Sequence, residues 1–247
     1  MNIDNIDLPA PFRVIGVGAG IEGVINKVNS FGLEEVSAEV VKHPYECIPN
    51  DGDLIAIIVF TDLEDTANRI ANTFHDAGIL TIGFSEDADP SCYDSIMLCE
   101  SRSDYPEIIK TLLQPIVTYC LISYDFEDLK TTLRNSEYFT VKSTSGNKIK
   151  DAIEKLQNAF SELEFTCVDN LSLSLYFNPN RTLPLAMNEQ ASLSQLMSTL
   201  PETVNVRWSV NHDESLNGDE IRMSAILSGK EVWKINYGKE TQNNTCQ

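Results

Sequence analysis

Basic residues are scarce in this sequence. Lys and Arg number 18 against 37 Asp and Glu, which gives a formal charge of −19. A chain with this charge repels nucleic-acid backbones and anionic lipid surfaces. We therefore expect neither a nucleic-acid partner nor a membrane-surface partner.

Long apolar runs and paired metal-ligand motifs are also missing. No run approaches the roughly 18 apolar residues of a membrane span, and no basic stretch followed by an apolar one marks a secretory leader. The six cysteines include no Cys-x-x-Cys pair, and the three histidines are far apart in sequence. We expect reduced core cysteines, no metal site and a cytoplasmic protein.

The first half alternates between buried strands and helices. Short apolar runs rich in Ile and Val occupy 12–18, 53–60, 78–84 and 94–100, a pattern typical of strands covered on both faces. A helix is expected over 62–78, with Asp62 as its cap and Gly78 at its end. Its apolar face would hold Leu63, Ala67, Ile70, Ala71 and Phe74. Strand and helix in alternation predict a parallel sheet.

The pattern changes after a long apolar stretch at 103–120, which predicts one buried helix bent at Pro115. Beyond it the sequence predicts strands at 137–144 and 171–177, an amphipathic helix at 147–160, and two final strands joined as a hairpin at Asn217-Gly218. This is the pattern of a second, α+β unit.

Glycine is scarce too, with 12 in the chain, yet three of them are closely spaced. Gly18, Gly20 and Gly23 form G-x-G-x-x-G after an apolar strand, the pattern of a dinucleotide-binding turn. Glu39 lies about 20 positions on, where such proteins hold a ribose. An NAD(P)-binding Rossmann protein is therefore one alternative. Against it, Glu22 places a carboxylate within the turn, and the second half shows no catalytic arrangement.

Three stretches together resemble the FtsZ branch of the tubulin superfamily. They are VIGVGAGIEGVINKV, LISYDFEDLKTTL and SVNHDESLNGDEIRMSAILSG. The resemblance implies an α/β, FtsZ/tubulin-like fold with a Rossmann-like parallel-sheet domain, a central helix and a smaller C-terminal α+β domain. The implied boundaries are 1–103, 104–120 and 121–229, followed by a polar tail at 230–247.

The resemblance also implies two phosphate loops, and both depart from the family pattern. Family members hold the nucleotide phosphates with glycine-rich backbone. Here the first loop contains Ile21 and Glu22, and Ile21 is expected to pack against the neighbouring helix. The second loop reads TDLEDT and supplies Thr61 and three acids but no glycine.

The acids of the second loop are Asp62, Glu64 and Asp65. Together with Glu22 they would repel a triphosphate by several kcal/mol unless cations intervened. We therefore expect a degenerate site and no nucleotide cofactor, with GTP or GDP as the alternative.

A third loop keeps its family residues. In active members, two aspartates after the central helix reach the nucleotide of the neighbouring subunit; the matching residues are Asp125 and Asp128, with Ser123 in place of an asparagine. One interpretation is a retained interface role. The other is that both simply cap the following helix.

These patterns predict a pseudo-GTPase, a non-enzymatic FtsZ/tubulin-like protein that acts through protein contacts. Its partner would be a filament or another assembly, with a complete FtsZ-type homologue as one candidate and self-association as another. The main alternative is a residual GTP-binding, polymerising GTPase. No other catalytic constellation is evident, and the acidic loop at 85–92 could hold a cation but is more typical of a solvated turn.

Overall fold

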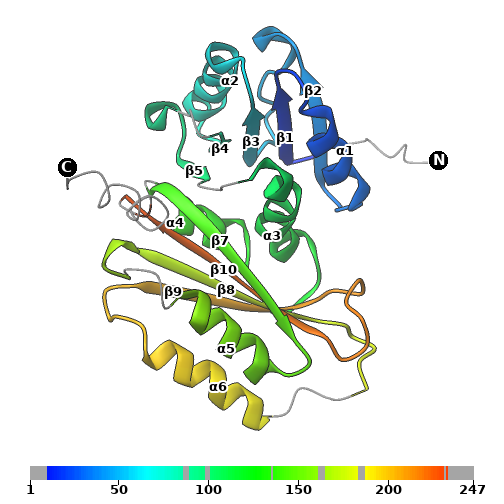
Figure 1. Ribbon diagram of the computed structural model, residues 1–247. Coiled ribbons are helices and arrows are strands. Elements are labelled where there is room, and N and C mark those ends of the chain that lie inside the picture. The colour runs from blue at the N-terminus through cyan, green and yellow to red at the C-terminus, as the bar shows by residue number, and fades with distance from the viewer. Residues whose placement is uncertain are drawn as a thin grey trace, which may run out of the picture. The chain divides into compact units, whose positions relative to one another are not determined.

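Two units make up the chain, and a single helix runs from one into the other. A computed structural model describes residues 10–85, 89–97, 101–134, 136–160, 165–182, 187–230 and 232. The first unit comprises Met1–Ile96 and Glu100–Lys110, and the second comprises Met97–Cys99 and Thr111–Gln247. Helix α3, Tyr105–Val117, begins in the first and ends in the second (Figure 1). The sequence predicts that this helix ends at Cys120. In the structure it ends three residues earlier, at Val117.

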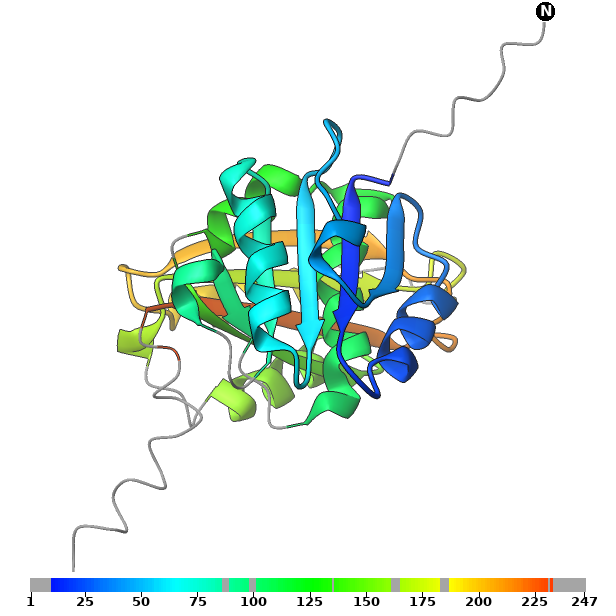
Figure 2. The same ribbon diagram turned by 90° about the horizontal axis from the view of Figure 1, so that it is seen from above.

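The first unit is built on a parallel sheet with the strand order β2-β1-β3-β4-β5. Its strands are β1 (Phe12–Val17), β2 (Val36–Val41), β3 (Ile55–Phe60), β4 (Leu80–Phe84) and β5 (Ser95–Met97). Its helices are α1 (Glu22–Ser30) and α2 (Glu64–Asp76), with 3-10 turns at Pro44–Glu46, Pro90–Cys92 and Arg102–Asp104. In Figure 2, β2 is the lighter blue strand beside β1, at the edge of this sheet. The predicted parallel sheet is confirmed.

Helices α1 and α2 cover opposite faces of this sheet. On α1, Ile25 packs so tightly on Gly16 of β1 that a Cβ at Gly16 would lie 2.7 Å from its Cγ1. On α2, the Phe74 ring lies 5.2 Å from the guanidinium of Arg13. Because side chains alternate along a strand, Arg13 and Gly16 face opposite sides. Every residue of β3 between them is buried, as its continuous apolar sequence requires.

The start of α2 differs from the sequence prediction. The helix begins at Glu64, and Leu63 stands at the N-cap position with no side-chain cap. Leu63 is 41% exposed and does not join the apolar face. Asp62, the predicted cap, makes a different contact that is described below. The remaining predicted positions are buried, namely Ala67, Ile70, Ala71 and Phe74.

The second unit is a mixed sheet with the order β7-β10-β8-β9-β6. Its strands are β6 (Cys120–Ile122), β7 (Glu137–Gly146), β8 (Asn170–Phe177), β9 (Asn205–His212) and β10 (Ile221–Gly229). Its helices are α4 (Phe126–Leu133), α5 (Ile149–Phe160) and α6 (Met187–Ser198), with a 3-10 turn at Phe165–Cys167. Strand β10 is antiparallel to β7 and β8, whereas β8 and β9 are parallel.

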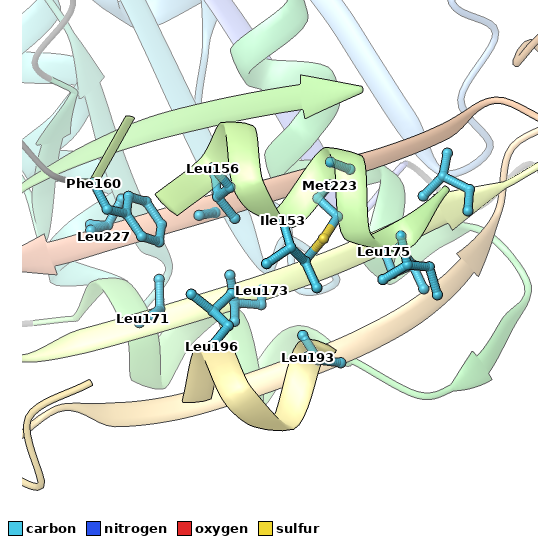
Figure 3. Packing of buried hydrophobic residues seen from close by; sticks show 14 of the residues in the cluster. Ile153, Leu156, Phe160, Leu171, Leu173, Leu175, Leu193, Leu196, Met223 and Leu227 are labelled. Carbon is cyan, nitrogen blue, oxygen red and sulfur yellow. The ribbon is translucent and has the colours of Figure 1, made fainter. Parts of the chain in front are cut away.

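Alternation along β8 sorts its side chains between two faces. Leu171, Leu173 and Leu175 join the core beneath α5 and α6 (Figure 3). The intervening serines point to the other face, where the Ser174 hydroxyl accepts a hydrogen bond from Ser209 at 3.0 Å. Hydroxyl pairing of this kind satisfies polar groups in a layer that is also buried.

The predicted hairpin between the last two strands is wrong. Strands β9 and β10 lie on opposite sides of β8 and do not pair. Asn217 and Gly218 do form a turn, in which the Glu220 N–H donates to the Asn217 carbonyl at 2.8 Å and Gly218 has φ +49°. The local turn signal is therefore correct, but burial of the apolar β8 at the centre of the sheet decides the strand order.

Candidate functional site

Two loops of the first unit meet at the carboxyl ends of β1 and β3. These strands are neighbours with Val17 in register with Phe60, so the loops that follow them leave the sheet side by side. The Thr61 hydroxyl lies 3.0 Å from the Ala19 carbonyl. The structure thus brings together the two stretches that the sequence analysis assigned to a phosphate site.

Asp62 places its carboxylate directly on the first loop. Its Oδ1 accepts a hydrogen bond from the backbone N–H of Ala19 at 3.1 Å, and the Thr61 hydroxyl lies 3.1 Å from the same oxygen. Gly18 has φ +100°, and a Cβ there would collide with that oxygen and lie 2.6 Å from Thr61 Oγ1. Glycine is therefore required at position 18 both by the backbone and by the approach of the second loop.

The other two glycines of the G-x-G-x-x-G pattern, Gly20 and Gly23, differ in whether the structure requires glycine. Gly20 has φ +75°, which favours glycine. Gly23 lies within α1, and a methyl group added to it would meet nothing within 4 Å, so no close approach requires glycine there. Ile21 is 1% exposed, and its Cγ2 would lie 3.0 Å from a Cβ at Gly16. Ile21 is therefore buried against β1, and its packing against the neighbouring helix stays a prediction.

The other acids of the two loops lie at the start of the helix that follows each loop. Glu22 lies in the first turn of α1, and Glu64 and Asp65 lie in the first turn of α2. All three are exposed. Negative charge at a helix N-terminus interacts favourably with the helix dipole. Asp62 therefore differs from them, because it bonds to a loop distant in sequence.

Glu39 is held by a cation from the neighbouring strand. Its Oε1 accepts from Arg13 at 2.6 Å, and the same guanidinium lies 3.2 Å from Asp53 Oδ2 and 2.8 Å from the Ile48 carbonyl. Glu39 lies within β2, in register with Ile15, rather than at the end of the strand. A ribose would have to compete with Arg13 for this carboxylate, which weighs against the dinucleotide interpretation.

Cys47 lies beside this cluster without being reactive. Its Sγ is 3.1 Å from the Arg13 guanidinium, and the residue is 1% exposed. Burial raises the pKa of the Cys47 thiol to about 12. A protonated, buried thiol is a poor nucleophile, so the structure gives no support to thiol chemistry here.

The aspartate loop of the second unit forms a reciprocal cap. The Asp128 N–H donates to Asp125 Oδ1 at 3.0 Å, and the Asp125 N–H donates to Asp128 Oδ2 at 3.3 Å. Asp128 also pairs with Arg207 of β9, with Nε 3.3 Å from Oδ1. Both aspartates therefore begin α4 in the way that the capping interpretation expects. Asp125 and Ser123 remain exposed.

Apolar side chains that the sequence analysis did not single out are exposed next to this loop. Tyr119 is 71% exposed, Leu121 54% and Ile122 37%. Trp208, at 38%, lies two residues from Val210, which is in register with Ile122. Three of these residues are neighbours in sequence, and Trp208 lies on β9, the strand that pairs with β6. Exposed apolar side chains that gather in one region mark contact surfaces. We call Tyr119, Leu121, Ile122 and Trp208 the apolar loop surface.

The described residues also bear on the acidic loop, on metal-ligand groups and on membrane-spanning helices. In the acidic loop, Asp89 Oδ1 accepts from the Ser91 N–H at 2.9 Å, a turn contact, while 86–88 lie outside the described residues. Within the described residues, no group of three or more His, Cys, Asp or Glu side chains could hold a metal. Among the helices of that same part of the chain, none combines the length and apolarity needed to cross a membrane.

Solved structures with the same fold cover nearly the whole chain. FtsZ of M. jannaschii, as a W319Y mutant, matches with TM-score 0.69 and 12% identity over 89% of this chain and 91% of its own. An empty FtsZ dimer from the same organism gives TM-score 0.68 and 14% identity over 90% of this chain and 89% of its own.

TubZ of Bacillus thuringiensis serovar israelensis, in GDP-form protofilaments, gives TM-score 0.58 and 9% identity over 96% of this chain and 91% of its own. No protein-family model and no curated protein sequence matches the chain. At these identities the likeness establishes the fold.

Proposed function

Because the chain has the FtsZ/tubulin fold, we propose that it is a non-enzymatic protein of this fold that acts through protein contacts in a filament or another assembly. A single observation carries the proposal: the carboxylate of Asp62 bonds to the Ala19 N–H in the first loop. A backbone N–H at this edge of the sheet is the kind of donor that holds a phosphate oxygen.

The contact works against phosphate binding in two ways. A phosphate oxygen could reach the Ala19 N–H only after the Asp62 carboxylate had left it. If Asp62 moved only a few ångströms, two negative charges about 4 Å apart would repel by about 4 kcal/mol near a protein surface. Glu22, Glu64 and Asp65 add to the negative potential because all lie in the first turns that follow these loops.

With no nucleotide bound at these loops, the surface proposed to contact a partner is the apolar loop surface together with Asp125. Its exposed tyrosine, leucine and isoleucine would contribute favourable burial on binding, at about 25 cal/mol per Å² of apolar area. Filaments are the assembled state named for the TubZ neighbour, which makes self-association plausible for this fold. A chain with one usable face and no working nucleotide face would bind the end of a filament without extending it.

Nucleotide titration tests the first half of the proposal. We expect neither GTP nor GDP at millimolar concentration to give titration heat or to raise the melting temperature, since a ligand far above its dissociation constant must stabilise the folded state. A complete FtsZ-type protein serves as the positive control. Micromolar binding to this chain would refute the pseudo-GTPase and support the polymerising GTPase instead.

Filament sedimentation tests the second half. Substoichiometric amounts of this chain should reduce pelleting of a complete FtsZ-type protein from the same cell. Leu121→Ser should weaken the effect, and so should Asp125→Ala combined with Asp128→Ala. Ile48→Ser is the matched control, because Ile48 is also exposed but belongs to the first unit. Unchanged pelleting at every ratio would remove the capping role.

A further inference from the structure

The outer edge of β2 is unpaired in the described part of the first unit. Strand β2 pairs with β1 on one side, and no described strand of the unit pairs with it on the other (Figure 2). An unpaired edge offers a row of backbone N–H and C=O groups to any extended chain. Proteins commonly protect such edges with Lys or Pro, or with a charged side chain that points inward.

The sequence of β2 provides little of this protection. It reads VSAEVV, with no lysine and no proline. Its one charged residue, Glu39, is bound to Arg13 at 2.6 Å, so its charge is already partnered. Val40, on the face that α1 packs against, is 37% exposed. The edge is therefore largely uncharged and open to pairing.

Exposed apolar side chains continue into the segment that follows. Tyr45 is 76% exposed and stacks on His43, with ring centroids 5.2 Å apart, while Ile48 is 63% exposed. The Ile48 carbonyl accepts from the Arg13 guanidinium that also binds Glu39. The shared arginine holds this segment on the α2 face of the sheet, whereas Val40 lies on the α1 face. Exposed apolar side chains therefore flank the β2 edge on both faces, where the alternating side chains of an added strand would meet them.

The charge of this region selects the partner. Residues 31–54 contain six acids and one Lys or Arg, Lys42. Two of the acids, Glu39 and Asp53, are paired with Arg13, and the other four are exposed, namely Glu34, Glu35, Glu46 and Asp51. Two copies of the chain would bring these acids together, and each copy carries a formal charge of −19. Like charges across an interface oppose docking. A second copy is therefore disfavoured, and a basic segment is complementary.

We propose that the edge of β2, with Val40, Tyr45 and Ile48, binds an extended protein segment in which Lys or Arg alternates with β-branched residues. The segment would add a strand beside β2, with main-chain hydrogen bonds providing affinity and its basic side chains meeting the acids of 31–54. This inference does not depend on the state of the phosphate loops.

A synthetic peptide tests the proposal with the full chain. The probe is a fluorescent peptide of alternating Lys and Val, and binding is followed by anisotropy at about 0.15 M salt, where long-range attraction is screened. We expect saturable binding, together with slower amide exchange at 36–41. Replacing Lys by Glu in the peptide should abolish binding.

One change separates strand addition from simple charge attraction, and a second tests whether the peptide binds at β2. Methylating alternate backbone nitrogens of the peptide keeps its charge but removes hydrogen bonds, and should weaken binding by about tenfold or more. Val40→Lys should weaken it similarly. Gln195→Lys, at an exposed position on α6 of the second unit, is the control that should leave it unchanged. Tyr45→Ser, in an exposed turn, provides a second variant should Val40→Lys fold poorly. Equal binding of the methylated peptide would overturn the proposal.

Discussion

Asp62 and Asp125 form the same bond in two different units of the molecule. Each carboxylate accepts from a backbone N–H, at 3.1 Å for Asp62 and at 3.0 Å for Asp125. Asp125 bonds three residues ahead, within the helix that it begins, whereas Asp62 bonds to Ala19, 43 residues away in sequence. The local bond completes a helix end. The long-range bond joins the loops that follow β1 and β3.

The largest expected effect comes from a substitution at Gly18, the glycine that Asp62 approaches closely. Gly18→Ala should destabilise the first unit by about 3 kcal/mol, because Gly18 has φ +100° and the new methyl group would meet Asp62 and Thr61. Urea denaturation measures the change in the free energy of unfolding.

Gly23→Ala is the matched control for this substitution. Gly23 is in α1 with open space around it, so alanine should stabilise the helix by up to about 1 kcal/mol. Similar losses from both variants would show that the approach of Asp62 does not constrain Gly18.

The second-largest expected effect comes from removing the cap that Asp125 and Asp128 form at the start of α4. Asp125→Ala with Asp128→Ala should lower the free energy of unfolding by about 1.5 kcal/mol, because α4 loses both halves of its cap and the pair with Arg207. Chemical denaturation followed by far-UV circular dichroism measures it. Glu127→Ala, at an exposed position in the same turn, should change stability by less than about 0.5 kcal/mol. An equal loss from Glu127→Ala would contradict the capping assignment.

A smaller effect isolates the long-range hydrogen bond. Asp62→Ala should lower stability by about 1 kcal/mol and speed hydrogen exchange at the Ala19 amide, because its acceptor is removed. Asp62→Asn keeps an acceptor oxygen and should change exchange less. If both variants left exchange at Ala19 unaltered, the two loops would not be joined by this bond in solution.

The smallest effect near neutral pH concerns two buried groups with raised pKa values. They are the thiol of Cys47 in the first unit and the phenol of Tyr124 in the second. Burial raises the pKa of Cys47 from 9.0 to about 12 and that of Tyr124, beside Asp125, from 10.0 to about 12. Each folded-state pKa lies above its unfolded value, so the stabilisation is complete below about pH 9 and is lost as pH rises towards 12. Stability should therefore fall over this range. Cys47→Ala and Tyr124→Phe should each make the fall shallower, and an unchanged slope would contradict the assignment.

The sequence was sufficient to predict the fold class, and the solved neighbours confirm it. Continuous apolar runs such as that of β3 specify buried strands directly, and alternation along β8 specifies its two faces. The reciprocal cap at Asp125 and Asp128 was also one of the interpretations that the sequence offered, because a cap depends on residues three apart.

Interactions that depend on distant residues were harder to predict. Asp62 has the spacing of a helix cap, and only the folded loops show that its carboxylate bonds to Ala19 instead. The Asn217-Gly218 turn forms as expected, yet the position of β8 between β9 and β10 depends on competition for burial across the whole sheet. Exposure of Tyr119 and Leu121 could not be inferred from an apolar stretch, since apolar stretches are usually buried.

The position of β10 has a consequence for how the second unit is made on the ribosome. Strands β7 and β8 are joined in its sheet by β10, which the chain supplies only at Ile221–Gly229. Until those residues emerge, at about 5 to 20 residues per second, both neighbouring strands present unpaired edges. For a period of seconds, the edges of β7 and β8 that β10 covers in the folded unit stay open to pairing with other chains.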